Sequence, residues 1–128
     1  MLINLTNRSS DTWSKSQRLA AEPYGRVVDF PMPPLPADAP EEEADRITTL
    51  VVRRVLKRLQ EVPEGEQAEH AVVCQGDFVL VFRIVTLLKA EGITVLAPAF
   101  ERVTRPTLRP DGTTAAGYSF EFVRFRSY

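Results

Sequence analysis

The sequence predicts an α/β fold, a three-layer Rossmann-like parallel sheet of four strands with a C-terminal antiparallel β-hairpin. Within residues 70–98, a short apolar run, a glycine turn, an apolar helical segment and a second apolar run follow one another, which is the pattern of a βαβ unit. The last third of the chain is rich in aromatic and β-branched residues around the turn signal Pro110-Asp111-Gly112. The length of 128 residues is that of one domain, residues 1–128.

The beginning of the chain predicts two strands and a helix. Residues 2–5 form a short apolar run, interrupted by Asn4, and predict the first strand. The polar cluster that follows offers several N-caps for a helix over residues 12–21, which a Pro-Tyr-Gly sequence then breaks. Residues 26–30 predict the second strand.

A proline-rich segment and a long helix come next. Five prolines within residues 31–40 predict an extended, stiff segment, which is either a plain linker or a rim of the ligand crevice. Asp38 and Glu41 resemble a capping box. The helix that follows runs to about Gln60, with apolar residues at helical spacing and four basic residues within 53–58 mostly on the solvent side.

The βαβ unit consists of a strand at 71–74, a helix at 78–88 and a strand at 93–97, with Gly92 closing the helix. Apolar residues cover nearly the whole circumference of this helix, so it must be buried on more than one side. In so small a chain we expect the second cover to be another subunit. The sequence therefore predicts a symmetric homodimer that packs partly through this helix.

The terminal hairpin is predicted from strands at 100–108 and 118–126. Period-two alternation places Arg124 and Arg126 on the same face as Phe120 and Phe122. That face is expected to line a crevice, to border a subunit or to protect a sheet edge.

The composition excludes several classes of protein. The apolar fraction of 44% and the charged fraction of 26% are typical of a soluble globular protein. A net charge of −1 argues against a binder of long nucleic acid. The chain shows neither a signal peptide nor a membrane-spanning stretch, and its one cysteine, Cys74, is expected in the core. These features predict a cytoplasmic protein without a membrane partner.

Metal and cofactor chemistry have no signature here. One histidine and one cysteine cannot form the usual metal-binding motifs, and we expect no metal and no cofactor. His70 precedes the third strand, so it should lie at the edge of the sheet opposite the crevice. Gln75-Gly76-Asp77 matches neither a dinucleotide-binding glycine motif nor a P-loop.

Polar residues instead gather where the predicted parallel strands end, which is the edge where such sheets bind ligands. Helix N-termini offer free N–H groups to phosphate at two of these points. Arg8 and Arg102 could each add a bidentate phosphate contact. The sequence thus indicates a shared anion or nucleotide site. Its residues are Thr6, Asn7, Arg8, Ser9 and Ser10 after the first strand, Gln75, Gly76 and Asp77 after the third, and Glu101 and Arg102 after the fourth.

The chain resembles the CRISPR-associated Rossmann-fold (CARF) domains, and more narrowly the small stand-alone ring nucleases that bind or degrade cyclic oligoadenylates. The resemblance covers most of the chain as architecture. Its residues are Leu5-Thr6-Asn7-Arg8-Ser9-Ser10, Gln75-Gly76-Asp77-Phe78 and Phe100-Glu101-Arg102.

The resemblance implies a homodimer that binds a cyclic oligoadenylate across its two-fold axis, over the strand ends, in type III CRISPR defence. Cleavage in that family needs no metal, because a ribose 2′-hydroxyl attacks its own 3′-phosphate and the protein supplies positioning and charge. It implies Ser9 and Arg102 as catalytic positions. The ligand contacts it implies are Thr6, Asn7, Arg8, Ser10, Gln75, Gly76, Asp77, Phe78 and Glu101. Whether the ring is cleaved or only bound stays open, as do two alternatives, a hydrolase or transferase acting on a mononucleotide and a non-catalytic assembly subunit.

Overall fold

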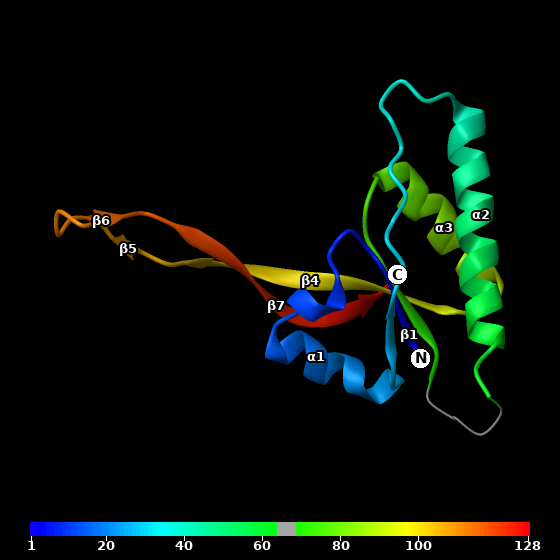
Figure 1. Ribbon diagram of the computed structural model, residues 1–128, viewed down its shortest axis with the longest axis horizontal. Coiled ribbons are helices and arrows are strands. Elements are labelled where there is room, and N and C mark those ends of the chain that lie inside the picture. Colours follow the sequence, from blue (N-terminus) through cyan, green and yellow to red (C-terminus); the bar gives the residue numbers. More distant parts are fainter. Residues whose placement is uncertain (64–68) are drawn as a thin grey trace.

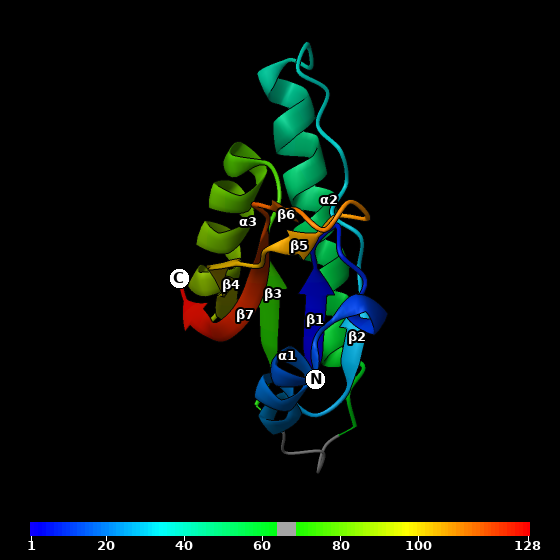
Figure 2. The same ribbon diagram turned by 90° about the vertical axis from the view of Figure 1, so that its left-hand side faces the viewer.

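A five-stranded sheet in the order β2-β1-β3-β4-β7 forms the centre of the computed structural model, which describes residues 1–63 and 69–128. Neighbours among β1 to β4 are parallel, and β7 pairs antiparallel with β4 (Figure 2). The α/β class, with a mostly parallel sheet and antiparallel C-terminal strands, is confirmed. The strands of this sheet are β1 (Leu2–Leu5), β2 (Val27–Asp29), β3 (Ala71–Cys74), β4 (Thr94–Thr104) and β7 (Tyr118–Ser127).

Helices lie on both faces of the sheet. α2 (Glu41–Gln60) and α3 (Phe78–Ala90) cover one face, and the short α1 (Lys15–Ala21) packs on the other (Figure 1). Every residue of β1 and of β3 is buried, and successive side chains alternate between the two apolar cores. Burial on both faces explains why these strands read as continuous apolar runs in the sequence.

Two helices begin later than the sequence predicts. α1 starts at Lys15 instead of residue 12, because the Ser14 hydroxyl caps it by accepting from the Gln17 N–H at 3.2 Å. Residues Ser10–Thr12 form a separate 3-10 turn. The expected capping box of α2 is wrong, since Pro40 is the N-cap residue and no side chain caps the helix. Three glutamates in its first turn face the positive end of the helix dipole instead.

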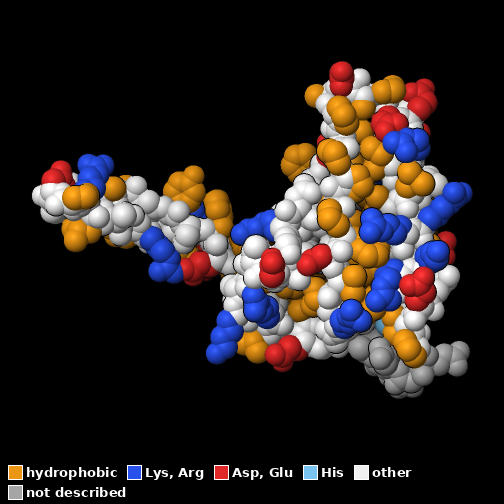
Figure 3. Space-filling model, in the orientation of Figure 1, with side chains coloured by type: hydrophobic (Ala, Val, Ile, Leu, Met, Phe, Trp, Pro, Cys, Tyr) orange, Lys and Arg blue, Asp and Glu red, His pale blue; other side chains and the backbone are white. Residues whose placement is uncertain are grey.

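The fourth strand is longer than expected. β4 runs through Pro98 without a break, because Leu96 is its last partner of β3 and the proline lies where β4 has a neighbour on one side only. Beyond the body of the protein, β4 and β7 continue as a two-stranded arm whose tip holds β5 (Thr107–Leu108) and β6 (Thr114–Ala115) (Figure 1). Hydrophobic side chains stand out on this arm (Figure 3).

A β-bulge changes which side chains share a face of β7. Ala99 pairs with Arg124 whereas Phe100 pairs with Phe122, so Val123 is an extra residue in β7. Phe122 therefore lies on the α1 side together with Phe125, their ring centroids 4.9 Å apart. Arg124 and Arg126 alternate with Phe125 and point to the opposite face. The expected common face of these arginines with Phe120 and Phe122 is wrong for this reason.

Close packing at Gly76 leads to a stability prediction. A Cβ atom on Gly76 would lie 2.9 Å from Cγ of the buried Met32. We expect Gly76→Ala to lower the free energy of unfolding by about 1–3 kcal/mol, since the methyl group overpacks this contact. Urea denaturation of Gly76→Ala, Met32→Ala and the double variant checks this, because the double variant should lose less than the sum of the single changes. An unchanged midpoint for Gly76→Ala contradicts it.

Cys74 is fully buried in β3, as expected, and burial raises the pKa of its thiol to about 12. The thiolate is the reactive form, so the native protein should resist thiol reagents. We expect labelling by a disulfide reagent at pH 8 to be slower in the native protein than in denaturant by about a thousandfold or more, since it requires opening of the fold. Fast native labelling would contradict this burial.

Among the helices that the structure describes, none combines the length and the apolar character needed to cross a membrane.

Candidate functional site

The carboxyl ends of the parallel strands form the floor of the candidate site on the α1 side. Period-two alternation turns Thr6, Gln75 and Phe100 toward this face, each at or beyond the end of its buried strand segment. The structure brings these three side chains together with Arg8 around a small hollow. Of the predicted site residues, then, Thr6, Arg8 and Gln75 do converge.

The α2/α3 side of the same strand ends is filled by the proline-rich segment. Met32 is buried against Gly76, and its N–H lies 3.4 Å from the Thr6 carbonyl oxygen. Phe30 is also buried, and its N–H donates to the Asn4 carbonyl. The segment is therefore more than a linker, because it closes one side of the strand ends and leaves the α1 side as the open one.

Asp29, at the end of β2, organises the turn after β1. Its carboxylate accepts hydrogen bonds from Asn4 Nδ2 at 2.7 Å, from the Ser10 N–H and hydroxyl at 3.0 and 2.8 Å, and from the Ser9 hydroxyl at 3.2 Å. Burial raises the pKa of this carboxyl, but the hydrogen bonds outweigh it and hold the pKa below its usual value. The Ser9 and Ser10 hydroxyls are thus committed to the protein's own carboxylate. The sequence reasoning missed Asp29, although an acidic residue ending the neighbouring strand was the available signal.

Thr6 also stabilises the turn after β1. Its hydroxyl lies 3.0 Å from Asn4 Oδ1 and 3.1 Å from the Arg8 carbonyl, and it accepts from the Arg8 N–H at 3.1 Å. Asn7 is exposed at the outside of the turn. The turn therefore fixes the position from which Arg8 extends.

The start of α3 does not offer the free N–H groups that the sequence suggests for phosphate. Asp77 is the N-cap, and its carboxylate accepts from the N–H groups of Val79 and Leu80 at 2.9 and 3.1 Å. These are the donors that a phosphate would need, and the protein's own anion occupies them. Phe78 is 91% exposed and belongs to the outer surface of α3 rather than to the strand ends.

Glu101 and Arg102 lie on the arm instead of at the strand ends. Glu101 pairs with Glu121 across the hairpin. Arg102 pairs with Phe120, and its guanidinium lies 4.1 Å from the centroid of the Tyr118 ring. Opposite residues of an antiparallel pair share a face, so Arg102 continues, further out, the face on which Phe120 lies.

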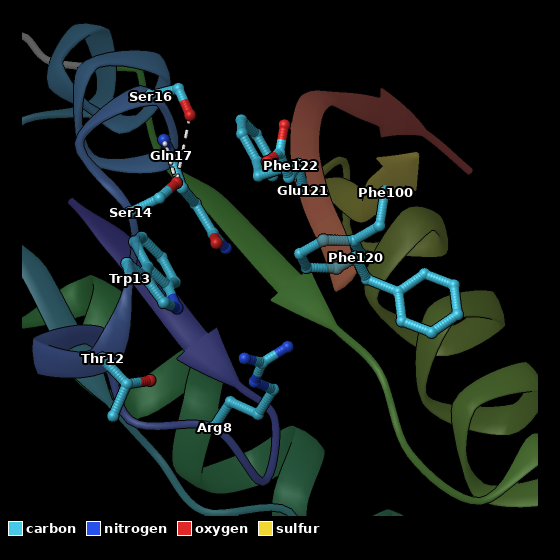
Figure 4. A pocket seen from close by; sticks show the side chains of 10 residues that line it. All are labelled: Arg8, Thr12, Trp13, Ser14, Ser16, Gln17, Phe100, Phe120, Glu121 and Phe122. Carbon is cyan, nitrogen blue, oxygen red and sulfur yellow. Dashed lines mark hydrogen bonds between the residues drawn. The ribbon is translucent and has the colours of Figure 1, made fainter. Parts of the chain in front are cut away.

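A pocket of about 380 Å³ opens between α1 and this face of the arm (Figure 4). Four of its ten lining residues are aromatic, and the others are polar or charged. Phe100 and Phe122 meet edge to face at 6.0 Å, and the ring of Phe120 is 61% exposed. The pocket is lined by Arg8, Thr12, Trp13, Ser14, Ser16, Gln17, Phe100, Phe120, Glu121 and Phe122.

Arg8 is the cation of this pocket. Its guanidinium lies 5.7 Å from the centroid of the Phe100 ring, and among the described residues no carboxylate forms an ion pair with it. Glu121, in the opposite wall, is paired with Arg105 on the arm. The pocket thus presents one unpaired positive charge near the exposed ring of Phe120 and the partly buried ring of Phe100.

Trp13 and Gln17 were not predicted as site residues, and Phe120 and Phe122 were expected only as part of a face that lines a crevice, borders a subunit or protects a sheet edge. They come from α1, from the turn before it and from the arm, and Gln17 points from α1 into the space between them (Figure 4). The available signal was a glutamine four residues before the buried Ala21, and therefore on the inner face of the helix. His70 lies at the amino end of β3, as expected, where its Nδ1 is 3.0 Å from the Met1 nitrogen.

Within residues 1–63 and 69–128, no cluster of three or more His, Cys, Asp or Glu side chains could hold a metal ion. Comparison with known protein families matches residues 1–126 to the family described as "Uncharacterized protein MJ1673 family". No curated protein and no solved structure matches the chain.

Proposed function

The chain belongs to the uncharacterized protein MJ1673 family, and we propose that it is a cytoplasmic, Rossmann-like three-layer domain that binds a cyclic oligoadenylate. We also propose that the protein acts in type III CRISPR defence, as its resemblance to CARF domains implies. The observation that carries the binding proposal is the pocket between α1 and the arm, where aromatic rings, among them the exposed ring of Phe120, share the lining with an arginine that pairs with no carboxylate of the described residues.

The aromatic rings suit a nucleobase. Stacking of a base on an aromatic side chain contributes about 1–3 kcal/mol per base. Phe120 offers the most exposed ring, and Phe100 and Phe122 stand behind it in the same wall. Tyr118 extends the row along the arm, with its ring centroid 5.7 Å from that of Phe120. A ligand with more than one base therefore finds more than one ring.

The arginines suit phosphate. Arg8 lies in the pocket, and Arg102 lies further along the same face of the arm, beside Tyr118. Each guanidinium can donate two parallel hydrogen bonds to phosphate oxygens. Cations at both places, with aromatic rings between them, match a ligand that alternates bases and phosphates better than they match a mononucleotide.

The outer face of α3 supports a homodimer. Phe78 is 91% and Phe82 74% exposed, and together with Val81, Val85 and Tyr128 they border an apolar depression of about 550 Å³. Exposed aromatic residues grouped in this way mark association surfaces. We therefore propose that two copies pack through α3, as the apolar sequence of this helix predicts, and that the dimer offers two pockets to its ligand.

The geometry of the pocket favours binding of the ligand over its cleavage. Neither Ser9 nor Arg102, the two expected catalytic positions, lines the pocket. The Ser9 hydroxyl donates to Asp29 and is held there. Ring opening in the presence of EDTA, detected by chromatography of the recovered ligand, would add metal-independent cleavage to the binding activity.

The test is a titration of the protein with cyclic tetra-adenylate, cyclic hexa-adenylate, linear tetra-adenylate and ATP, followed by calorimetry and thermal shift. One cyclic ligand should bind most tightly and, at a hundred times its Kd, stabilise the fold by about 2.7 kcal/mol. Phe120→Ala should weaken it, while Leu108→Ala, an exposed arm residue outside the pocket, should not. Absence of binding to every ligand overturns the proposal, and preference for ATP favours the mononucleotide enzyme instead.

A further inference from the structure

Gln17 has a buried side chain whose amide forms no hydrogen bond. The residue is 6% exposed, and while its backbone N–H donates to Ser14 Oγ, its side chain forms no hydrogen bond with the described residues. A primary amide can form up to four hydrogen bonds. No buried side-chain N or O atom of the described residues lacks a hydrogen-bond partner, so the unbonded amide of Gln17 is not sealed in the core and keeps access to the open space of the pocket.

The other buried polar side chains in the described part of the chain are all bonded. Asn4 donates to Asp29 and to the Arg8 carbonyl, Thr6 bonds to Asn4, and the Thr48 hydroxyl donates to the Ala44 carbonyl. Gln17 is thus the exception among the buried polar residues. Its side chain lines both the pocket and the small hollow at the strand ends, next to the aromatic residues of the pocket wall. The missing partner is therefore to be sought in the pocket.

We propose that Gln17 is the specificity-determining residue of this pocket and selects adenine by hydrogen bonding to the edge of the base. The inference rests on the proposed nucleotide-binding function and adds to it the group that reads the base. A ring stacked on the wall formed by Phe120 and Phe122 presents its edge sideways, which is where a group on α1 can reach it.

The chemistry of the amide favours adenine over guanine. Glutamine offers one acceptor and one donor side by side, and adenine offers the complementary donor N6–H₂ and acceptor N7. At the same edge, guanine offers two acceptors, O6 and N7, of which the amide can satisfy only one. Desolvating the unmatched group disfavours guanine, so discrimination follows from an unpaired polar atom as well as from the pair that forms.

The test compares linear tetra-adenylate with linear tetra-guanylate, titrated into the wild-type protein and into Gln17→Leu under conditions that prevent guanine quadruplexes. We expect the wild type to prefer the adenine ligand at least tenfold, and Gln17→Leu to reduce that preference to within about twofold. Gln17→Glu, which loses the donor but keeps the acceptor, should weaken adenine binding while leaving stacking intact. Phe120→Ala, by contrast, should weaken both ligands about equally.

Thermal stability without ligand distinguishes this role from a structural one. Gln17→Leu should leave the Tm nearly unchanged, because the amide has no hydrogen bond within the protein to lose, whereas Asn4→Leu should lower the Tm, because it breaks satisfied hydrogen bonds. Adenine preference retained by Gln17→Leu, or a clear fall in its Tm, overturns the assignment of Gln17 alone. Failure of the wild type to bind either ligand overturns both this inference and the proposed function.

Discussion

Arg8→Ala is expected to weaken binding of the proposed cyclic oligoadenylate ligand by roughly 10- to 100-fold, since a charge-assisted hydrogen bond contributes about 1.5–3 kcal/mol. The guanidinium extends into the pocket and forms no ion pair with the described residues, so its loss should leave no carboxylate unpaired. The Tm of the free protein should therefore stay nearly unchanged. Calorimetric titration measures the first effect and thermal denaturation the second.

A matched control comes from Arg26, an exposed arginine just before β2, at the opposite end of the sheet from the pocket. Arg26→Ala makes the same change in charge without touching the pocket, so it should bind like the wild type. Equal losses for Arg8→Ala and Arg26→Ala would show a general effect of net charge and would contradict a phosphate contact at Arg8.

Arg102→Ala extends the same experiment to the arm. Arg102 stacks on Tyr118 and lies outside the pocket walls, so its contribution depends on a ligand long enough to reach it. We expect Arg102→Ala to weaken the cyclic ligand and to leave the affinity for AMP unchanged, whereas Arg8→Ala weakens both. An Arg102 variant that binds every ligand normally would limit the site to the pocket.

Phe82→Glu is expected to convert a dimer into monomers while each chain stays folded. The Phe82 ring is 74% exposed in the single chain, so a glutamate there meets water in the monomer. In the proposed interface the same carboxylate would be buried without a partner, which costs several kcal/mol. A penalty of about 3 kcal/mol raises the dimer Kd more than a hundredfold. Light scattering over a range of concentrations measures the mass, and circular dichroism reports the fold.

Leu19→Glu is the control for this change. Leu19 is an exposed leucine on α1, on the other face of the sheet, and the substitution adds the same charge. It should leave the dimer intact. A wild-type protein that is monomeric at micromolar concentration, or a Phe82→Glu protein that remains dimeric, contradicts an interface through α3.

Much of the scaffold could be predicted because it depends on local periodicity. The buried strands at 2–5 and 71–74 appear as apolar runs, and the helix from Phe78 onward appears as a long apolar segment after Asp77. Gly92, with its φ of +76°, marks the end of that helix. Alternation along the strands also explains why certain side chains converge at the strand ends. The face on which a side chain lies depends only on whether its position in the strand is odd or even.

Other features of the site depend on competition between neighbouring groups. The Asp77 carboxylate accepts hydrogen bonds from the N–H groups that the sequence predicts to be free for phosphate. The Asp29 carboxylate accepts from the Ser9 and Ser10 hydroxyls that the sequence predicts to contact a ligand. A sequence pattern does not indicate which of several acceptors will form a hydrogen bond with a given donor. A carboxylate held beside the donor by the fold has a large advantage over a diffusing ligand, and only the spatial arrangement reveals which carboxylates are so held.

The sequence by itself determined the α/β class, the parallel strand segments and the polar strand ends, because periodicity and turn residues act within a few positions of one another. The tertiary structure decided the pocket. Its walls join α1 to an arm about a hundred residues later, and the extra Val123 shifts the alternation of β7 so that Phe122 and Phe125 both face α1. Contacts so distant in the chain arise from packing of the whole domain, which no local pattern records.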